Sequence, residues 1–151
     1  MSEKYLIFGA TGSIGSSLSR QLKQSGKEVH LVARNESEVK KLSEELGCTF
    51  TVADVLENGF VDKVKAEVPD VKGIAYCVGS IVLKPLRMIK EDEFNQCMKL
   101  NCYSALEVIR GYQDTLKKSK GSVVLFSTVA VRRGFSNHGI IASAKAAVEG
   151  L

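Results

Sequence analysis

The residues best suited to chemistry begin with a glycine-rich stretch near the N-terminus. Residues 9–15 read GATGSIG, directly after the apolar run KYLIF and directly before apolar residues at helical spacing. Gly9 allows a tight turn, Gly12 lets the backbone approach a ligand closely, and Gly15 lets a helix pack against a sheet. Free amides and the positive end of the helix dipole favour an anion at such a helix start. The stretch therefore predicts a site for a pyrophosphate.

Two further candidates, His138 and Lys145, lie in the last fourteen residues, HGIIASAKAAVEGL. Lys145 is surrounded by small residues, which permit close approach of a ligand or of a second helix, so we expect it to face a site rather than solvent. A histidine titrates near neutral pH and can act as a general acid or base. We expect His138 on a loop beside the same site, where it either transfers a proton or makes a polar contact.

Short apolar runs alternate with amphipathic stretches along the chain, and these elements must position the candidates. We expect strands in the apolar runs KYLIFGA, EVHLVA, CTFTVA, KGIAYCVG and GSVVLFST, and helices over residues 14–25, 36–46, 58–68, 91–118 and from about 140. Asn35 is suited to cap the second helix. Strands this apolar are typical of a parallel sheet that helices cover on both faces. The pattern predicts a Rossmann-like, doubly wound α/β fold with its ligand crevice at the carboxyl ends of the strands.

The long helix expected over residues 91–118 places an amide on its apolar stripe. The stripe consists of Phe94, Met98, Asn101, Ala105, Val108, Tyr112 and Leu116. A buried amide needs hydrogen-bond partners. We therefore expect Asn101 either to bind water in a proton relay or to make a structural bond from the helix to the backbone.

Composition excludes several classes of protein. The chain has 151 residues, is 44% hydrophobic and 25% charged, and carries a net charge of +4, which is too small and too scattered to indicate nucleic-acid binding. No apolar run approaches the roughly 20 residues of a membrane span, and the N-terminus does not resemble a secretory signal. The four cysteines have no zinc-site spacing, so we expect no metal, and we expect buried, reduced thiols in a cytoplasmic protein.

These features resemble the short-chain dehydrogenase/reductase family. The likeness starts at the glycine stretch, which reads G-x-x-G-x-x-G with a threonine before the second glycine, and it continues to the last residue. It implies that NAD or NADP is bound by Gly9, Thr11, Gly12, Ser13, Ile14 and Gly15. It also implies roles for Asp54, which would receive the adenine amino group, and for Val55, whose backbone would flank the ring. In YCVG, where the family usually has N-N-A-G, only Gly79 matches, and it suits packing against the adenosine ribose.

The end of the second expected strand indicates which nucleotide binds. An acidic residue there selects NAD through the ribose hydroxyls, whereas a cation accommodates the 2′-phosphate of NADP. Ala33 occupies the acidic position and Arg34 follows it. A guanidinium matches a phosphate with a bidentate fork. We therefore expect NADP(H), and NAD stays open because Glu36 is near enough in sequence to reach a ribose.

The resemblance also implies catalytic positions. Asn101 lies twenty-two residues beyond Gly79, the family's usual separation, and would support a proton relay. Thr128, with Ser127 beside it, stands where the family has a serine that orients the substrate carbonyl, and it keeps the hydroxyl. Lys145 stands where the family has a lysine that holds the nicotinamide ribose and lowers the pKa of a catalytic tyrosine.

The catalytic tyrosine itself is missing, which makes this an atypical member. Counting thirteen residues from Thr128, or four back from Lys145, reaches Ile141 in both cases. Isoleucine cannot carry a proton. His138 is the nearest titratable candidate to replace it, and Tyr103 and Tyr76 are weaker ones.

Three functions follow from this reading. The first is an NADP(H)-dependent oxidoreductase acting on a small carbonyl or alcohol with a substituted proton donor. The second is an NADP(H)-binding sensor or partner subunit without turnover, and the third is a related non-redox enzyme such as an isomerase. Residues 1–151 would form the N-terminal three-fifths of the family's domain, so we expect a longer chain whose remainder covers the fifth strand and selects the substrate. The family implies homodimers or homotetramers through the two longest helices.

Overall fold

Five parallel strands form the centre of the molecule. The computed structural model describes residues 4–151. Its strands are β1 (Lys4–Phe8), β2 (Glu28–Ala33), β3 (Thr49–Val52), β4 (Gly73–Tyr76) and β5 (Ser122–Leu125). They pair in the order β3-β2-β1-β4-β5, and every pair is parallel. The direction of winding therefore reverses between β1 and β4, which is where open sheets of this kind bind ligands.

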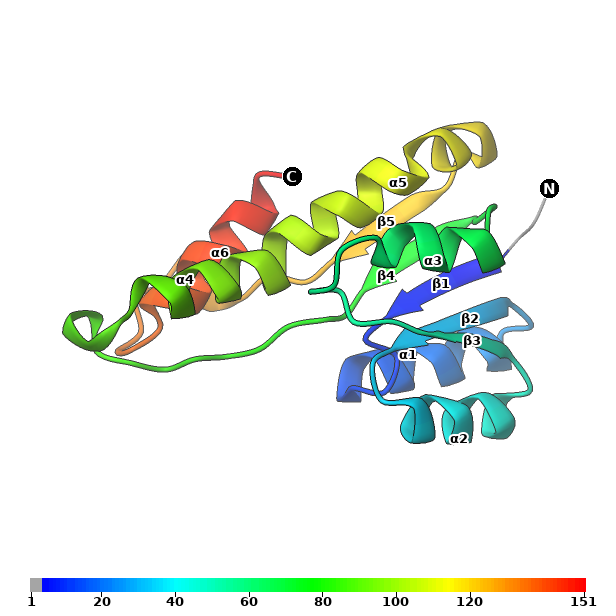
Figure 1. The fold of residues 1–151 in the computed structure, drawn as a ribbon, viewed down its shortest axis with the longest axis horizontal. Coiled ribbons are helices and arrows are strands. Elements are labelled where there is room, and N and C mark those ends of the chain that lie inside the picture. The colour runs from blue at the N-terminus through cyan, green and yellow to red at the C-terminus, as the bar shows by residue number, and fades with distance from the viewer. Residues whose placement is uncertain (1–3) are drawn as a thin grey trace.

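Helices cover both faces of this sheet, as predicted (Figure 1). They are α1 (Ser13–Gln24), α2 (Glu36–Leu46), α3 (Phe60–Glu67), α4 (Glu91–Met98), α5 (Ser104–Ser119) and α6 (Gly139–Glu149), with short 3₁₀ turns at Leu86–Met88 and Val129–Val131. Alternate side chains of β1 point to opposite layers: Ile7 packs in the core with α1 and α2, whereas Leu6 and Phe8 pack in the core with α3 and α5. A third cluster joins α4 to α6 at one end of the molecule. The doubly wound α/β architecture is confirmed.

The helix expected as one piece over residues 91–118 is divided. A π-helical segment, Lys99–Tyr103, separates α4 from α5. The part of the predicted stripe after this π segment is buried as expected, but Phe94 before it is 37% exposed and Cys97 is buried instead. A π turn adds a residue to the helical turn, so it rotates the buried face. The spacing rule fails here because it assumes one unbroken period.

The fifth strand also differs from the expectation that the strands are buried on both faces. Ser122 is exposed and Val124 is 49% exposed, whereas Val123 and Leu125 are half-buried. β5 is the edge of the sheet that residues 4–151 form, with β4 as its only paired neighbour there. An apolar run alone cannot distinguish an edge strand from a central one.

A buried histidine of β2 forms hydrogen bonds with β3, away from the carboxyl ends of the strands. The two ring nitrogens of His30 lie 2.7 Å from Thr49 Oγ1 and 2.8 Å from Thr51 Oγ1. Thr51 in turn donates to a carboxylate oxygen of Glu67 at 2.9 Å. Burial lowers the pKa of His30 to about 4; the charge of Lys4 adds to this effect and that of Glu67 opposes it. The imidazole is therefore neutral in the folded protein at neutral pH.

This shift predicts that the protein loses stability between pH 6.5 and 4. The pKa of His30 is lower in the folded state than in the unfolded state, so in this window the unfolded chain binds more protons and acid favours unfolding. The full loss is on the order of 3 kcal/mol. Urea unfolding at pH 7, 6 and 5 would measure it. The variant His30→Val should show a weaker pH dependence than the native protein over the same range, and an equal dependence would contradict the assignment.

Candidate functional site

The loop between β1 and α1 forms the floor of the candidate site. Gly9 has a φ of +72°, and a Cβ there would lie 2.9 Å from the backbone of Cys77 and Val78. A Cβ on Gly15 would lie 2.2 Å from the carbonyl oxygen of Gly9. The fold itself requires these two glycines. Gly12 differs, because its Cβ would approach only Gly9 O, at 3.4 Å.

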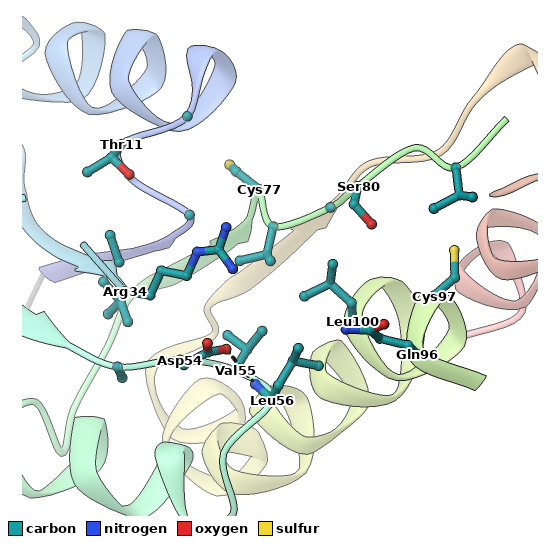
Figure 2. A pocket seen from close by; sticks show the side chains of 18 of the residues that line it. Thr11, Arg34, Asp54, Val55, Leu56, Cys77, Ser80, Gln96, Cys97 and Leu100 are labelled. Carbon is teal, nitrogen blue, oxygen red and sulfur yellow. Dashed lines mark hydrogen bonds between the residues drawn. The ribbon is translucent and has the colours of Figure 1, made fainter. Parts of the chain in front are cut away.

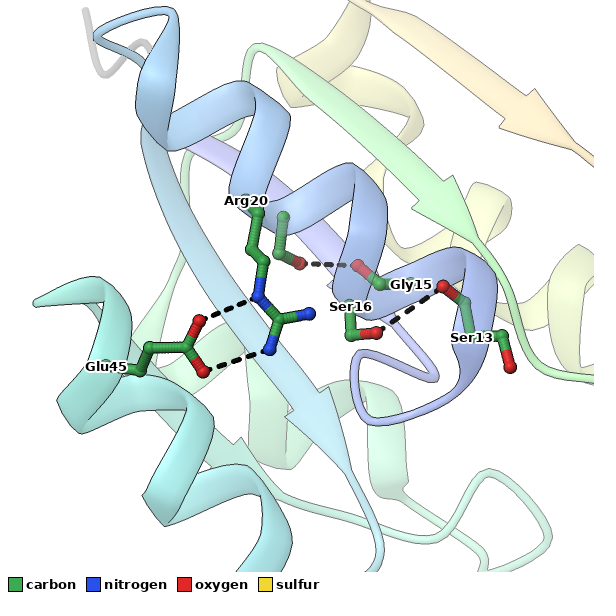
Figure 3. Close-up of polar contacts among 6 residues, drawn as sticks. Ser13, Gly15, Ser16, Arg20 and Glu45 are labelled. Carbon is green, nitrogen blue, oxygen red and sulfur yellow. Dashed lines mark hydrogen bonds and ion pairs between the residues drawn. The ribbon is translucent and has the colours of Figure 1, made fainter.

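The start of α1 offers unpaired backbone donors. Gly12 is the N-cap, no side chain caps the helix, and its first turn contains no acidic residue. The first amides of a helix have no partner within it. The serine hydroxyls leave those amides accessible, since Ser16 donates to Ser13 O at 3.4 Å and Ser19 donates to Gly15 O at 2.7 Å (Figure 3). The N-terminus of α1 therefore fits a phosphate group.

An ion pair holds α1 against α2 close to this loop. Arg20 makes a bidentate contact with Glu45, at 2.7 Å and 2.9 Å (Figure 3). The hydrogen bonds raise the pKa of the Arg20 guanidinium and lower that of the Glu45 carboxyl. Both groups are well exposed, so the pair orients the helices and adds little to stability.

A pocket of about 490 Å³ begins at this loop. Its lining comes from the ends of β1, β2, β3 and β4 and from α4 (Figure 2). The lining residues are Gly9, Thr11, Gly12, Val32, Ala33, Arg34, Ala53, Asp54, Val55, Leu56, Cys77, Val78, Gly79, Ser80, Val82, Glu93, Gln96, Cys97 and Leu100. Tertiary structure thus brings most of the predicted cofactor positions to one cavity, at the reversal between β1 and β4.

Arg34 and Asp54 lie at one end of this pocket. The exposed Arg34 side chain extends over the pocket from the end of β2 (Figure 2). Asp54 accepts a hydrogen bond from the backbone N–H of Leu56 at 2.9 Å through one carboxylate oxygen, which leaves the other oxygen for a ligand. Val55 is buried behind it. Glu36, the residue that kept NAD open, is exposed at the start of α2 and is absent from the lining.

Gly79 marks where Asn101 and Lys145 converge. A Cβ at Gly79 would lie 3.0 Å from Asn101 Oδ1 and 3.7 Å from Lys145 Nζ. Asn101 is 1% exposed and donates to the carbonyl of Cys97 at 3.0 Å, so it makes the helix-to-backbone bond that was one of its two expected roles. Its Oδ1 has no partner, and it is the only such buried side-chain atom found in residues 4–151. An orphaned buried acceptor is costly, so this atom fits a bound water or ligand group.

Burial lowers the pKa of Lys145, and the thiols of Cys97 and Cys102 oppose this shift. Lys145 is thus half-buried on α6 beside Gly79, as its small neighbours in sequence predicted. Neither Lys145 nor Asn101 is part of the pocket lining. Both lie next to Gly79, which is a lining residue.

A core residue occupies the position where the family spacing predicts a tyrosine. Ile141 is 3% exposed and packs with Cys97, Ile140 and Ala144. His138 immediately precedes α6, lies outside the pocket lining and places Nδ1 2.8 Å from Ser136 O. This is the polar contact that was the alternative to proton transfer.

The two weaker candidates also lie outside the lining. Tyr76 is buried, donates to the carbonyl of Leu100 at 2.8 Å, and has its pKa raised by burial. Tyr103 is 48% exposed. Neither geometry presents a phenol to the pocket.

Thr128 lies beyond β5 and outside the pocket lining. Its hydroxyl accepts from Ala130 N at 3.3 Å and so caps a short 3₁₀ turn. The neighbouring Ser127 donates to one carboxylate oxygen of Glu149 at 2.6 Å, and Arg132 donates to the other at 3.0 Å. Glu149 therefore ties the Thr128 loop to the end of α6, a positioning contact that no sequence motif indicated.

Sequence reasoning missed how the π segment is anchored. Lys99 Nζ donates to Leu56 O at 2.9 Å, and Ser104 donates to Val55 O at 2.8 Å. Together with the bond from Tyr76 to Leu100 O, these contacts connect the segment that carries Asn101 to the loop of Asp54. The one available signal was Tyr76 itself, an aromatic residue at a position where asparagine was expected.

The comparisons with known proteins agree with this geometry. The family described as "Enoyl-(Acyl carrier protein) reductase" matches residues 9–151. The uncharacterized oxidoreductase YIR035C of Saccharomyces cerevisiae is 32% identical over 98% of this chain and 62% of its own length. A 3beta-hydroxysteroid dehydrogenase of Mediterraneibacter gnavus is 30% identical over 97% of this chain and 56% of its own. The chain belongs to the short-chain dehydrogenase/reductase family, and it spans about three-fifths of these relatives.

Solved structures share the fold. A short chain dehydrogenase/reductase family protein superposes with a TM-score of 0.93 at 22% identity, covering 98% of this chain and 64% of that one. An alcohol dehydrogenase from Thermococcus sibiricus, complexed with 5-hydroxy-NADP, gives 0.91 at 24% identity, covering 99% and 68%. In residues 4–151, no helix is long and apolar enough to cross a membrane, and no three His, Cys, Asp or Glu side chains gather as metal ligands.

The glycine geometry predicts that two similar substitutions destabilise the fold to different extents. Gly15→Ala should destabilise the fold by about 1–3 kcal/mol, because its Cβ meets a backbone oxygen that cannot move freely. Gly12→Ala should cost about 1 kcal/mol or less, since the surroundings are open and the change affects only the helix cap. Thermal and urea unfolding of both variants would measure this. Equal destabilisation would show that Gly12 is also needed by the fold.

Proposed function

We propose that this protein is an NADP(H)-dependent oxidoreductase that transfers hydride between the nicotinamide and a small carbonyl or alcohol. The observation that carries the proposal is the course of the pocket, from the uncapped start of α1 at Gly12 to Gly79, where Asn101 and Lys145 meet. This arrangement combines a phosphate site with a buried cation and an orphaned acceptor. Family membership supports the same chemistry.

In this proposal the cofactor-binding residues divide by the part of the dinucleotide that they hold. The loop of Gly9, Thr11, Gly12, Ser13, Ile14 and Gly15 holds the pyrophosphate. Asp54 and Val55 hold the adenine, Gly79 packs against the adenosine ribose, and Lys145 holds the nicotinamide ribose. When bound, the nicotinamide supplies hydride transfer, and the protein supplies orientation and one proton.

NADP is proposed over NAD because of Arg34. Ala33 offers no carboxylate for ribose hydroxyls, and the Arg34 guanidinium extends over the pocket. The complex of the Thermococcus sibiricus relative with 5-hydroxy-NADP is consistent with this choice. A 2′-phosphate would gain a charge-assisted bidentate contact there.

Catalysis is proposed to use Asn101, Thr128 and Lys145, and the sequence offers His138 as one candidate proton donor. Lys145 would stabilise negative charge that develops during proton transfer. Asn101 would hold a water through its free Oδ1. Thr128 would orient the substrate oxygen, since its hydroxyl proton is not used in the contact with Ala130 N.

One observation favours the second candidate, an NADP(H)-binding sensor or partner subunit without turnover. Ile141 is packed into the core at the position where a tyrosine was expected. Its buried aliphatic side chain leaves no room for a water molecule and cannot donate a proton. Such a protein would bind the cofactor through the same loop and reduce no substrate.

Assembly and location form a further part of the proposal. Tyr103 and Leu106, on the π segment and α5, are 48% and 38% exposed, which suits a homodimer or homotetramer formed through the long helices. All four cysteines are free, which suits a reducing cytoplasm.

Replacing Arg34 should separate the two nucleotides. Arg34→Ala removes a hydrogen-bonded charge partner worth about 1.5–3 kcal/mol, so NADPH affinity should fall roughly 10- to 100-fold. NADH affinity should stay unchanged. Calorimetric titration of both nucleotides into both proteins measures this, with Arg133→Ala as a control for loss of a positive charge elsewhere. Equal weakening of NADH would contradict the assignment to the 2′-phosphate.

Turnover separates the two functions. NADPH oxidation should be measurable against a panel of ketones and aldehydes, and Lys145→Met should abolish it. His138→Ala should abolish it as well if the imidazole donates the proton. NADPH binding without oxidation on any compound would instead establish the second function.

A further inference from the structure

Two helices place Cys97 beside the position of the missing tyrosine. On α6, Ile141 and Lys145 are one turn apart, and on the neighbouring α4 and π segment Cys97 and Asn101 are one turn apart, joined by the bond from Asn101 Nδ2 to Cys97 O at 3.0 Å. Asn101 and Lys145 meet at Gly79, and Cys97 packs in one cluster with Ile141. Cys97 is therefore packed against the turn of α6 that carries Ile141, one turn before the point where Asn101 and Lys145 meet.

The Cys97 thiol faces the pocket. Cys97 is part of the lining, and Figure 2 shows its sulfur at the end of the pocket where Ser80, Gln96 and Leu100 lie. The thiol sulfur accepts a weak hydrogen bond from Asn101 Nδ2 at 3.4 Å. The other atom of that amide, Oδ1, is the orphaned acceptor at Gly79. An unpartnered buried oxygen next to the thiol indicates that a polar group binds at this end.

The other titratable residues of the lining are unsuited to donate a proton here. Arg34 and Asp54 lie at the opposite end of the pocket, and Asp54 binds its own loop. Glu93 pairs with Lys84, which lowers its pKa, so it is ionised. Burial raises the pKa of Cys77 to about 11, and no neighbouring charge opposes the rise.

Cys97 differs from Cys77 in its partners. Burial raises the pKa of the Cys97 thiol, so it holds its proton at neutral pH, but the hydrogen bond from Asn101 and the charge of Lys145 oppose this rise. The same two groups would stabilise the thiolate once the proton has left.

We propose that the thiol of Cys97 donates the proton to the substrate carbonyl oxygen, in place of the tyrosine hydroxyl. The proposal rests on the proposed function, which supplies the hydride from NADPH to the carbonyl carbon. The S–H bond breaks, an O–H bond forms, and the alcohol leaves a thiolate beside the Lys145 ammonium. The thiolate then takes up one proton from solvent, so over one turnover the carbonyl, NADPH and one solvent proton give the alcohol and NADP+. Alcohol oxidation follows the same steps in reverse.

Substitution of Cys97 in the full-length protein tests this proposal. Cys97→Val keeps an apolar side chain but has no proton to donate, and Cys97→Ser introduces a hydroxyl whose proton is far harder to remove. Both should bind NADPH like the native protein and lose about 100-fold or more of carbonyl reduction. Cys102→Ser is the matched control, because Cys102 also interacts with Lys145 but is absent from the lining, and it should stay active. Native turnover in Cys97→Val would overturn the proposal.

A second measurement does not depend on turnover. The rate of alkylation of each cysteine by iodoacetamide, followed by mass spectrometry across pH 7 to 11, reports its thiol pKa. Lys145→Met should raise the pKa of Cys97 and slow its alkylation, whereas Lys118→Met, which removes an exposed lysine of α5, should not. Cys48, which packs between the sheet and α2, serves as the internal reference. An unchanged Cys97 pKa in Lys145→Met would show that the lysine does not act on this thiol and would overturn the proposal.

The outcomes distinguish this inference from the function on which it rests. If carbonyl reduction survives in Cys97→Val but is lost in His138→Ala, the oxidoreductase function stands and the histidine is the donor. If the native protein binds NADPH but reduces nothing, the function fails and the proton donor fails with it. If Cys97→Val abolishes turnover, Cys102→Ser does not, and NADPH still binds, both stand.

Discussion

The close approach of Gly15 to the carbonyl of Gly9 is the constraint on which the site depends. A Cβ at position 15 would lie 2.2 Å from that oxygen, so only glycine lets α1 begin directly above the end of β1. This contact aims the uncapped amides of α1 at the crevice between β1 and β4. The positive end of the α1 dipole then lies in the pocket floor, where an anion would be favoured.

The opposite wall of the pocket depends on the π segment. Tyr76 of β4 donates a hydrogen bond to Leu100 O within the segment. Lys99 in the segment and Ser104 directly after it donate to backbone carbonyls of the Asp54 loop. The wider turn rotates α4 relative to α5, which buries Cys97 and leaves Phe94 exposed. The same turn holds Asn101 with its Oδ1 unpaired at Gly79. Irregular helix geometry of this kind often accompanies a functional site.

The position where the family spacing predicts a tyrosine is part of an apolar cluster. Ile141 joins an apolar cluster with Cys97, Ile140 and Ala144, so this position contributes burial instead of a phenol. Lys145 is half-buried on the same helix, where burial lowers its pKa and the thiols of Cys97 and Cys102 oppose that shift. A cation kept in such surroundings costs free energy, which is consistent with a retained role for the lysine.

Much of the fold was predictable because its signals are local. Apolar runs, the Asn35 cap and the glycine spacing each arise from neighbouring residues. The strands, their parallel pairing and the glycine turn between β1 and α1 follow from them. The exposure of β5 and the π segment were not predictable, since an edge strand and a wider helical turn keep the same residue types as their regular counterparts. Family spacing placed Ile141 where a tyrosine was expected, and sequence reasoning suggested His138 in its place but did not indicate Cys97.

The sequence by itself determined the doubly wound fold and the family, and it predicted the glycine loop before α1, because each depends on short-range pattern. Only the tertiary structure decided which distant side chains meet. It brought Lys145 and Asn101 to Gly79, packed Cys97 in one cluster with Ile141, and left His138 outside the pocket lining. The physical reason is that helix rotation and packing between helices set these contacts, and a single π turn shifts them without changing any sequence motif.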